Sequence, residues 1–235
     1  MMSTPQLPRI LTRRFDDREA LLDALAERLA RALTQSGPRA IMLSGGSTPM
    51  PAYRALAARA VVPAPGLYIF FSDDRYVPST SEASNYYQSR PLLDALALPT
   101  EQVLRVRTEL PLDAAADDYE RRLAELAGRG VRCELGLLGL GADGHTASLF
   151  SAADLARAAG RRALPVHRPD GRDAVSVSPA VLADVAQLAF VVAGADKRSA
   201  LAALLARDPA LTGFQAIAAR PAIEVWTEPE ALPIA

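Results

Sequence analysis

Short apolar runs and amphipathic helical patterns alternate along nearly the whole chain, and this alternation restricts the fold more than any other feature. Runs that predict strands lie at 9–15, 40–43, 67–71, 133–140, 175–177, 188–193 and 223–226. Patterns that predict helices lie at 21–33, 49–60, 84–96, 112–127 and 196–206. Strands that alternate with helices favour a mostly parallel sheet with helices on both faces. We therefore predict an α/β chain: a single-domain, three-layer α/β/α sandwich over residues 1–235, with a mostly parallel, Rossmann-like sheet.

Three local expectations accompany this layout. Asp16 and Glu19 form a capping-box-like pair before the first helix. The stretch 151–173 is predicted to be rich in loops. Thr146 to Phe150, which follow a cluster of glycines, are predicted to form the first turn of a helix.

The composition excludes several classes of protein. Of the 235 residues, 50% are hydrophobic and 23% charged, and 26 basic against 27 acidic side chains give a net charge of -1. This balance does not resemble the electrostatic footprint of a nucleic-acid binder. The single cysteine, Cys133, fits a reducing compartment. We see no signal peptide and no apolar run near the ~18 residues of a membrane span, and we expect a cytoplasmic protein.

The first of four notable loops, each after a predicted strand, is Ser44-Gly45-Gly46-Ser47-Thr48-Pro49. Glycines let the backbone approach a ligand closely, and the helix that follows offers free amide groups and a positive dipole end. This chemistry suits a phosphate group, although the Gly-Lys-Ser/Thr of a P-loop is missing. A plain strand-to-helix turn fits the pattern equally well.

The second loop, Ser72-Asp73-Asp74-Arg75-Tyr76-Val77-Pro78, places two carboxylates and a guanidinium directly after a strand. Asp73 and Arg75 in this position can bind sugar hydroxyls, steer a base or clamp a phosphate. A solvated, turn-forming charge cluster is the simpler interpretation of the segment taken alone.

The third loop is the most distinctive segment of the chain, Leu-Gly-Leu-Gly-Ala-Asp-Gly-His-Thr-Ala-Ser-Leu-Phe at 138–150. It places Asp143 and His145 at the carboxyl end of a strand, where open α/β sheets bind ligands. Because histidine titrates near neutral pH, His145 can take a proton from water and return it to a leaving group. Asp143 can hold the imidazole in one tautomer, or it can cap the following helix instead.

The fourth loop, Gly194-Ala195-Asp196-Lys197-Arg198, has two cations at a predicted helix start. Cations there oppose the helix dipole, which favours an anionic ligand, although side chains without a role are a fair alternative. We assign no role to His167, the second of the two histidines. Two distant histidines and one cysteine give no metal-ligand spacing, so no metal site is expected.

Together these loops resemble the 6-phosphogluconolactonase family. That family shows a Ser-Gly-Gly-Ser-Thr-Pro loop, an Asp-Glu-Arg-x-Val-Pro segment, a Ser-Asn pair, Gly-x-Gly-x-Asp-Gly-His-Thr-Ala-Ser-Leu-Phe-Pro and Gly-x-x-Lys. They correspond here to 44–49, 73–78, Ser84-Asn85, 139–150 and 194–197. Order and spacing agree over about residues 40–200. The long histidine motif is highly specific, whereas the glycine loop is shared with a wider superfamily that includes glucosamine-6-phosphate deaminase.

The resemblance implies hydrolysis of 6-phospho-D-glucono-1,5-lactone to 6-phosphogluconate in the oxidative pentose phosphate pathway, with no metal and no organic cofactor. By position, His145 matches the family's general base, and Arg75 matches a residue that lines the substrate site. Lys197 and the 44–48 loop match phosphate contacts. We expect a sugar-phosphate lactone as the small-molecule partner, no nucleic acid or membrane partner, and a monomer, although the sequence leaves the oligomeric state open.

The chain departs from the family pattern at three places. Asp74 replaces a glutamate, and Ser151 replaces the proline after Leu-Phe. The family also has an arginine immediately before the strand that here includes 175–178, where this chain has Ala174. Arg172 is our first candidate for the second cation at the phosphate, with Arg168 and Arg198 as alternatives.

Two other functions are the alternatives. Amino-sugar-phosphate deaminases or isomerases on this fold back their histidine with a carboxylate five residues later, and here that position is Phe150. The tyrosine that usually follows their acidic pair is replaced by Arg75. Both differences favour a lactonase. A non-catalytic sugar-phosphate sensor would keep the phosphate loop and lose the catalytic group, whereas His145 is retained in its full motif.

Overall fold

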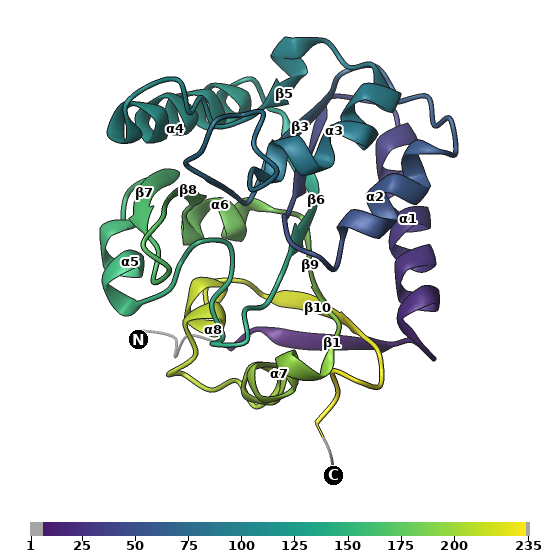
Figure 1. The fold of residues 1–235 in the computed structure, drawn as a ribbon, viewed down its shortest axis with the longest axis vertical. Helices are drawn as coiled ribbons and strands as arrows, with labels where there is room; N and C mark the ends of the chain where they lie inside the picture. Colours follow the sequence, from purple (N-terminus) through teal and green to yellow (C-terminus); the bar gives the residue numbers. More distant parts are fainter. Residues whose placement is uncertain (1–6, 234–235) are drawn as a thin grey trace, which may run out of the picture.

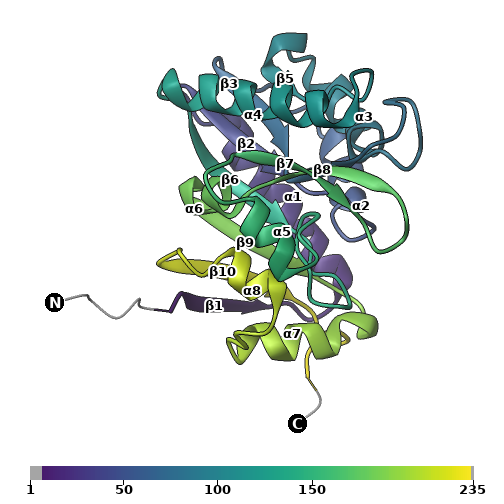
Figure 2. The same cartoon turned by 90° about the vertical axis from the view of Figure 1, so that its left-hand side faces the viewer.

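A seven-stranded parallel sheet forms the centre of the computed structural model, which describes residues 7–233 (Figures 1 and 2). Its strand order is β1-β10-β9-β6-β2-β3-β5. The strands are β1 (Arg9–Arg14), β2 (Arg39–Leu43), β3 (Leu67–Phe71), β5 (Val103–Leu104), β6 (Arg132–Leu138), β9 (Gln187–Val192) and β10 (Ala222–Thr227). The strands that follow β2 in the chain, β3 and β5, lie on one side of it in the sheet. The strands that follow β6, β9 and β10, lie toward the opposite end of the sheet. The connections therefore diverge between β2 and β6, and such switch points open a crevice at the carboxyl ends of the strands.

Helices cover both faces of this sheet. One face carries α1 (Arg18–Thr34), α2 (Met50–Ala57) and α3 (Asn85–Leu96). The other carries α4 (Leu112–Gly128), α6 (Pro179–Asp184), α7 (Arg198–Leu205) and α8 (Thr212–Ala216). Strand side chains alternate between two buried clusters: Ile41 and Leu43 join the first helical layer, and Met42 joins the second. The predicted three-layer architecture is confirmed.

A small antiparallel sheet lies beside the main one, with the order β4-β8-β7. It consists of β4 (Asp73–Arg75), β7 (Ala163–His167) and β8 (Asp173–Val177). The stretch 151–173, predicted to be rich in loops, also holds α5 (Ala152–Arg157) and the whole of β7, which were not predicted. Pro165 obscured the strand in the sequence, and β7 accommodates a proline because it lies at the edge of its sheet.

Two expectations about helix starts are wrong. The cap of α1 is Asp17 and not Asp16, since the Asp17 carboxylate accepts a hydrogen bond from the Ala20 amide at 2.8 Å. Thr146 to Phe150 form a turn and not a helix, because Ala147 has a left-handed φ of +50° that interrupts helical geometry. The helix that follows this turn is α5, which begins at Ala152 after its cap.

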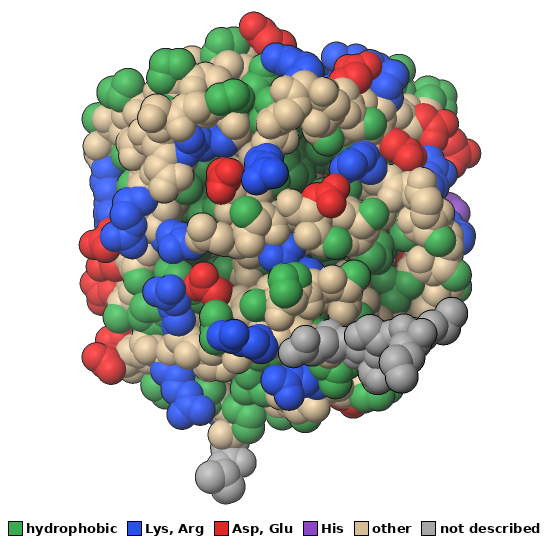
Figure 3. All heavy atoms as spheres, turned by 180° about the vertical axis from the view of Figure 1, so that it is seen from behind, with side chains coloured by type: hydrophobic (Ala, Val, Ile, Leu, Met, Phe, Trp, Pro, Cys, Tyr) green, Lys and Arg blue, Asp and Glu red, His purple; other side chains and the backbone are tan. Residues whose placement is uncertain are grey.

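Several short elements lie outside the predicted layout. They are β4, β5, α6, α8 and a 3₁₀ turn, η1 (Thr100–Gln102). The helix expected at 196–206 is divided into a second 3₁₀ turn, η2 (Ala195–Lys197), and α7. Among residues 7–233, none of the helices combines the length and apolar content needed to cross a bilayer. The face of the molecule in Figure 3 carries acidic and basic side chains interspersed with one another.

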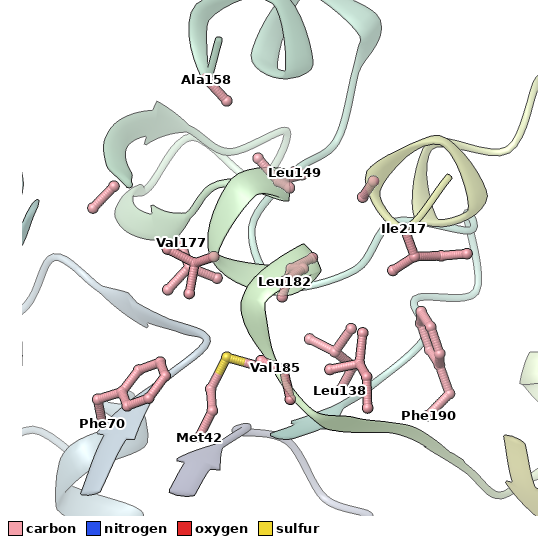
Figure 4. Packing of buried hydrophobic residues seen from close by; sticks show 14 of the residues in the cluster. Met42, Phe70, Leu138, Leu149, Ala158, Val177, Leu182, Val185, Phe190 and Ile217 are labelled. Atoms are coloured by element: carbon pink, nitrogen blue, oxygen red, sulfur yellow. The ribbon is translucent and has the colours of Figure 1, made fainter. Parts of the chain in front are cut away.

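The turn that follows the histidine motif is anchored in the core by Leu149. This side chain is buried and belongs to the same cluster as Val177, Leu182 and Ile217, as Figure 4 shows. Its amide donates a hydrogen bond to the Thr146 carbonyl at 3.0 Å. The segment that carries His145 is thereby tied to the hydrophobic core only four residues away.

We expect Leu149→Ala to lower the free energy of unfolding by about 2–5 kcal/mol, because it leaves a cavity in this cluster. Urea denaturation followed by circular dichroism measures the change. Val62→Ala is the control, since Val62 is 81% exposed and the substitution should change stability by no more than about 0.5 kcal/mol. Equal effects of the two substitutions would show that Leu149 does not anchor the turn.

Candidate active site

The four loops singled out in the sequence meet around one cavity of about 220 Å³ at the carboxyl ends of β2, β3, β6 and β9. This is the side of the sheet on which the connections after β2 and β6 diverge. Of the residues predicted for the site, those lining the cavity are Ser44, Gly45, Gly46, Ser47, Thr48, Asp73, Arg75, His145 and Lys197. Asn85 and Arg168 line it as well.

The loop at 44–49 packs closely against α3. A Cβ atom at Gly45 would overlap the Asn85 side chain, so this position requires glycine. Gly46 has a φ of +100°, a conformation that favours glycine. The Ser44 side chain is buried, and its hydroxyl has no hydrogen-bond partner among the described residues. Leaving a buried hydroxyl unpaired costs free energy, which a hydrogen bond to a ligand in the adjacent cavity would offset.

The adjacent carboxylates of the second loop have different surroundings. Asp74 is buried and accepts hydrogen bonds from the Ser84 hydroxyl at 3.0 Å and the Asn85 amide at 2.6 Å, which fixes the start of α3. Burial raises the pKa of Asp74 to about 6, although these hydrogen bonds partly oppose the shift. Asp74 therefore supports the site from behind, and it does not line the cavity.

Asp73 does line the cavity, where Asn85 connects it to Arg75. The Asn85 side-chain amide donates to the Asp73 carbonyl at 2.9 Å, and its oxygen accepts a hydrogen bond from the Arg75 guanidinium. The Oδ2 atom of the Asp73 carboxylate accepts a hydrogen bond from the Ser148 hydroxyl at 2.7 Å. We did not include Asn85 among the predicted site residues, although the Ser84-Asn85 pair was the signal that would have identified it.

His145 and Asp143 form a short contact, with 2.5 Å between the imidazole Nδ1 and the carboxylate. Partial burial raises the pKa of Asp143, but hydrogen bonds from the His145 ring and amide and the charge of the ring lower it by more. The pKa therefore lies below its ordinary value. No helix starts directly after Asp143 in the described chain, since α5 begins at Ala152 and is capped by Ser151. Asp143 itself lies outside the cavity lining.

Two glycines of the motif make this pair geometrically feasible. A Cβ atom at Gly141 would overlap both the His145 ring and the Asp143 carboxylate. Gly144 has a φ of +83°, and its carbonyl accepts a hydrogen bond from the Gly213 amide at the start of α8, at 2.8 Å. The spacing of the glycines thus follows from close approaches and not only from the need for a turn.

The cations around the cavity differ from our first expectation in one respect. Lys197 lines the cavity, with its amine 3.1 Å from the Asp196 carboxylate. Arg168 also lines it, and its side chain is only 14% exposed. Arg172 lies outside the cavity; its side chain is 56% exposed and pairs with Asp170 at 3.2 Å.

The geometry of the β7–β8 hairpin explains why Arg168, and not Arg172, lines the cavity. The turn between β7 and β8 is closed by the Arg168 amide, which donates to the Arg172 carbonyl at 2.8 Å. Of these two residues, it is Arg168 whose side chain reaches the cavity. Arg198, the third candidate, donates to the Glu230 and Leu232 carbonyls at 2.8 and 2.9 Å and holds the C-terminal segment.

The described residues contain no group of three or more histidine, cysteine, aspartate or glutamate side chains placed to hold a metal ion. What the cavity offers instead is a histidine paired with a carboxylate, a glycine loop at a helix start and several cations. This set can accept and return a proton and bind an anionic group in the same space.

Most of the chain is similar to known proteins. Residues 16–226 match the family described as glucosamine-6-phosphate isomerases/6-phosphogluconolactonase. The 6-phosphogluconolactonase of Synechocystis sp. is 35% identical over 201 residues, which cover 81% of each sequence. The crystal structure of 6-phosphogluconolactonase from Thermotoga maritima has a TM-score of 0.79 at 23% identity, over 94% of this chain and 100% of that one.

The same fold also occurs in a solved monomeric glucosamine-6-phosphate deaminase, with a TM-score of 0.78 at 15% identity over 94% of this chain and 98% of the deaminase. The fold is therefore common to two different activities. The residues in and around the cavity must therefore distinguish between them.

We expect Gly141→Ala to separate His145 from Asp143, because the added methyl group occupies the space of both side chains. The low-field proton resonance of the His145 Nδ1 in NMR spectra should disappear or shift strongly. His167, the second of the two histidines, serves as the internal reference. Gly128→Ala, where a Cβ meets nothing within 4 Å, should leave the resonance in place. An unchanged His145 signal in Gly141→Ala would contradict the steric argument.

Proposed function

The chain belongs to the glucosamine-6-phosphate isomerase/6-phosphogluconolactonase family, and on that basis we propose that it hydrolyses 6-phospho-D-glucono-1,5-lactone to 6-phospho-D-gluconate. The reaction is the lactone-opening step of the oxidative pentose phosphate pathway. The observation that carries the proposal is the His145–Asp143 pair at the rim of a cavity whose other walls suit a phosphate group. Membership of the family confirms the resemblance carried by the four loops.

The substrate phosphate binds at the glycine loop in this proposal. The loop amides of 45–48 and the Ser44 hydroxyl supply neutral donors at the start of α2. Lys197 supplies a point charge, and Arg168 supplies a planar set of donors. Arg168 takes the place that we first gave to Arg172.

His145 acts as the general base. Its Nδ1 is engaged by Asp143, so the imidazole presents its other nitrogen, Nε2, for proton transfer. His145 removes a proton from a water molecule, which attacks C1 of the lactone. Asp143 orients the ring and stabilises the imidazolium that forms, as carboxylates do in comparable catalytic groups.

The attack produces a tetrahedral intermediate with a negative oxygen at C1. Arg75, which lines the cavity, and the backbone amides near Gly45 are the donors we assign to this oxygen. As the bond between C1 and the ring oxygen breaks, the imidazolium returns its proton to that oxygen. The products are a carboxylic acid, which ionises, and a free hydroxyl group, so that one water molecule is consumed in total.

The proposed reaction requires only a base, water and hydrogen-bond donors, so it involves neither a metal nor an organic cofactor. We propose that the protein acts as a monomer. A single cysteine is consistent with action in the cytoplasm. We propose the sugar-phosphate lactone as the partner, with no nucleic acid.

The residue at position 150 favours the lactonase over the isomerase activity of the same family. The aromatic ring of Phe150 lies 4.2 Å from the His145 ring, centroid to centroid. A phenyl ring cannot exchange a proton, so His145 has no second carboxylate at this position to assist ring opening. Two relatives that are each 35% identical to this chain, over 81% and 79% of it, are named 6-phosphogluconolactonase, which supports the same choice.

We expect His145→Ala to lower the turnover number by about 10²–10⁴-fold, because general acid–base catalysis contributes that much. The Michaelis constant should change little, since the phosphate contacts remain. Acid release from freshly prepared 6-phosphogluconolactone, corrected for spontaneous hydrolysis, measures both constants. His167→Ala removes the other histidine outside the cavity and should leave both near the wild-type values. Wild-type turnover in His145→Ala would refute the assignment of the base.

The pair Arg168→Ala and Arg172→Ala tests the corrected phosphate contact. Losing a charge-assisted hydrogen bond costs about 1.5–3 kcal/mol, so the Michaelis constant of Arg168→Ala should rise about tenfold or more. Arg172→Ala should stay within about twofold of the wild type, since its side chain lies outside the cavity. The reverse order of effects would restore Arg172 as the second cation.

A further inference from the structure

Phe150 is a shared neighbour of two functional side chains that lie on different segments of the chain. Its ring centroid is 4.2 Å from that of His145, with 37° between the planes. The central carbon of the Arg168 guanidinium lies over the same ring, 5.1 Å from its centroid. His145 belongs to the loop after β6 and Arg168 to the turn after β7. Phe150 itself is outside the cavity lining, so its ring supports the wall without facing the cavity.

The backbone of Phe150 is held from two directions. Its amide donates to the Asp154 carboxylate at 3.1 Å, and its carbonyl accepts a hydrogen bond from the Thr212 hydroxyl at 3.3 Å. Asp154 is fixed in turn by the capping box with Ser151 and by Arg157 at 2.7 Å. The ring therefore starts from a backbone position that is tied to both α5 and α8.

Contacts with an aromatic face orient these side chains without using their hydrogen-bonding groups. The Nδ1 of His145 is already engaged by Asp143, and a stacking contact leaves its second nitrogen available. Arg168 donates to Asp170 at 3.2 Å and to the Ser148 hydroxyl at 3.3 Å. A cation–π contact adds a third constraint on the guanidinium and consumes none of its remaining donors.

We propose that Phe150 is a positioning residue that fixes the general base and the phosphate-binding arginine relative to each other. The roles of His145 and Arg168 in this inference rest on the proposed function. The contacts of the ring with both side chains do not depend on it. Replacing the ring should loosen both groups at once, so that turnover and phosphate binding deteriorate together.

A purely structural role for Phe150 is the alternative, because the side chain also packs against the buried cluster that contains Phe70. Three variants separate the two possibilities. Phe150→Leu keeps an apolar side chain and removes the ring, while Phe150→Tyr restores a ring. Phe70→Leu removes a ring from the same cluster at a position outside the cavity lining.

Steady-state kinetics on 6-phosphogluconolactone provide the first test. A stacking contact worth about 0.5–1.5 kcal/mol corresponds to a fall in the turnover number of about 2- to 12-fold in Phe150→Leu. A cation–π contact of about 1 kcal/mol corresponds to a rise in the Michaelis constant of about fivefold. Phe150→Tyr should recover both constants to within about twofold. Phe70→Leu should lose stability and keep both constants.

Two further readouts do not require catalysis, so the inference can be judged even if the wild-type protein fails to hydrolyse the lactone. The exchange of the His145 Nδ1 proton with water, followed by NMR, should accelerate in Phe150→Leu and not in Phe150→Tyr or Phe70→Leu. Binding of inorganic phosphate should weaken about fivefold in the same variant only. Wild-type behaviour of Phe150→Leu in both readouts, or equal defects in Phe150→Leu and Phe70→Leu, would overturn the inference.

Discussion

The parallel sheet brings the carboxyl end of every strand to the same edge, and the site depends on the way the chain leaves that edge. After β2 and β6, neighbouring strands in the sheet, the connections run toward opposite ends of the sheet. Backbone that diverges in this way cannot fill the space between the two strands. The glycine loop at 44–49 and the histidine motif consequently face each other across an open crevice. The loops after β3 and β9 complete the walls.

Close contacts between side chains and the backbone then determine which residues the walls of the cavity can contain. Asn85 occupies the space that a side chain at position 45 would need, and it also connects Asp73 with Arg75. The side chains of His145 and Asp143 likewise occupy the space that a side chain at position 141 would need. At Gly45 and Gly141, therefore, polar side chains occupy the space that a Cβ atom would need. The polar network of the site thus depends on glycine at these two positions.

Much of this arrangement could be read from the sequence, because it follows from local patterns. The strand 67–71 was predicted with its observed bounds. The predicted strand 40–43 starts one residue late, and 188–193 differs by one residue at both ends. Loops at the ends of parallel strands must converge, which is why nine of the predicted site residues line one cavity. The family assignment depended on the long histidine motif, whose residues are close together in the chain.

The features that escaped prediction depend on contacts between distant segments. Pro165 obscured β7, because its tolerance at that position follows from the edge location of the strand. The left-handed Ala147 ended helical geometry without a glycine or proline to signal it. The choice between Arg168 and Arg172 depends on which of two residues in one hairpin turn has a side chain that reaches the cavity. The role of Asp143, as a partner of His145 or as a helix cap, was ambiguous for a similar reason. The next helix starts only at Ala152, which is later than the sequence suggests.

The β7–β8 hairpin carries Arg168 to the cavity, and the position of this side chain depends on the register of the hairpin. Side chains alternate between the faces of a strand, so a one-residue slip of the hairpin would turn Arg168 away from the cavity. A two-residue change would restore the direction and move the cation along the strand by about 7 Å. The register and length of the hairpin therefore set the direction of the Arg168 side chain and its position along the cavity. His145 lies in the loop after β6 of the main sheet, and the Phe150 ring is a neighbour that it shares with the hairpin cation.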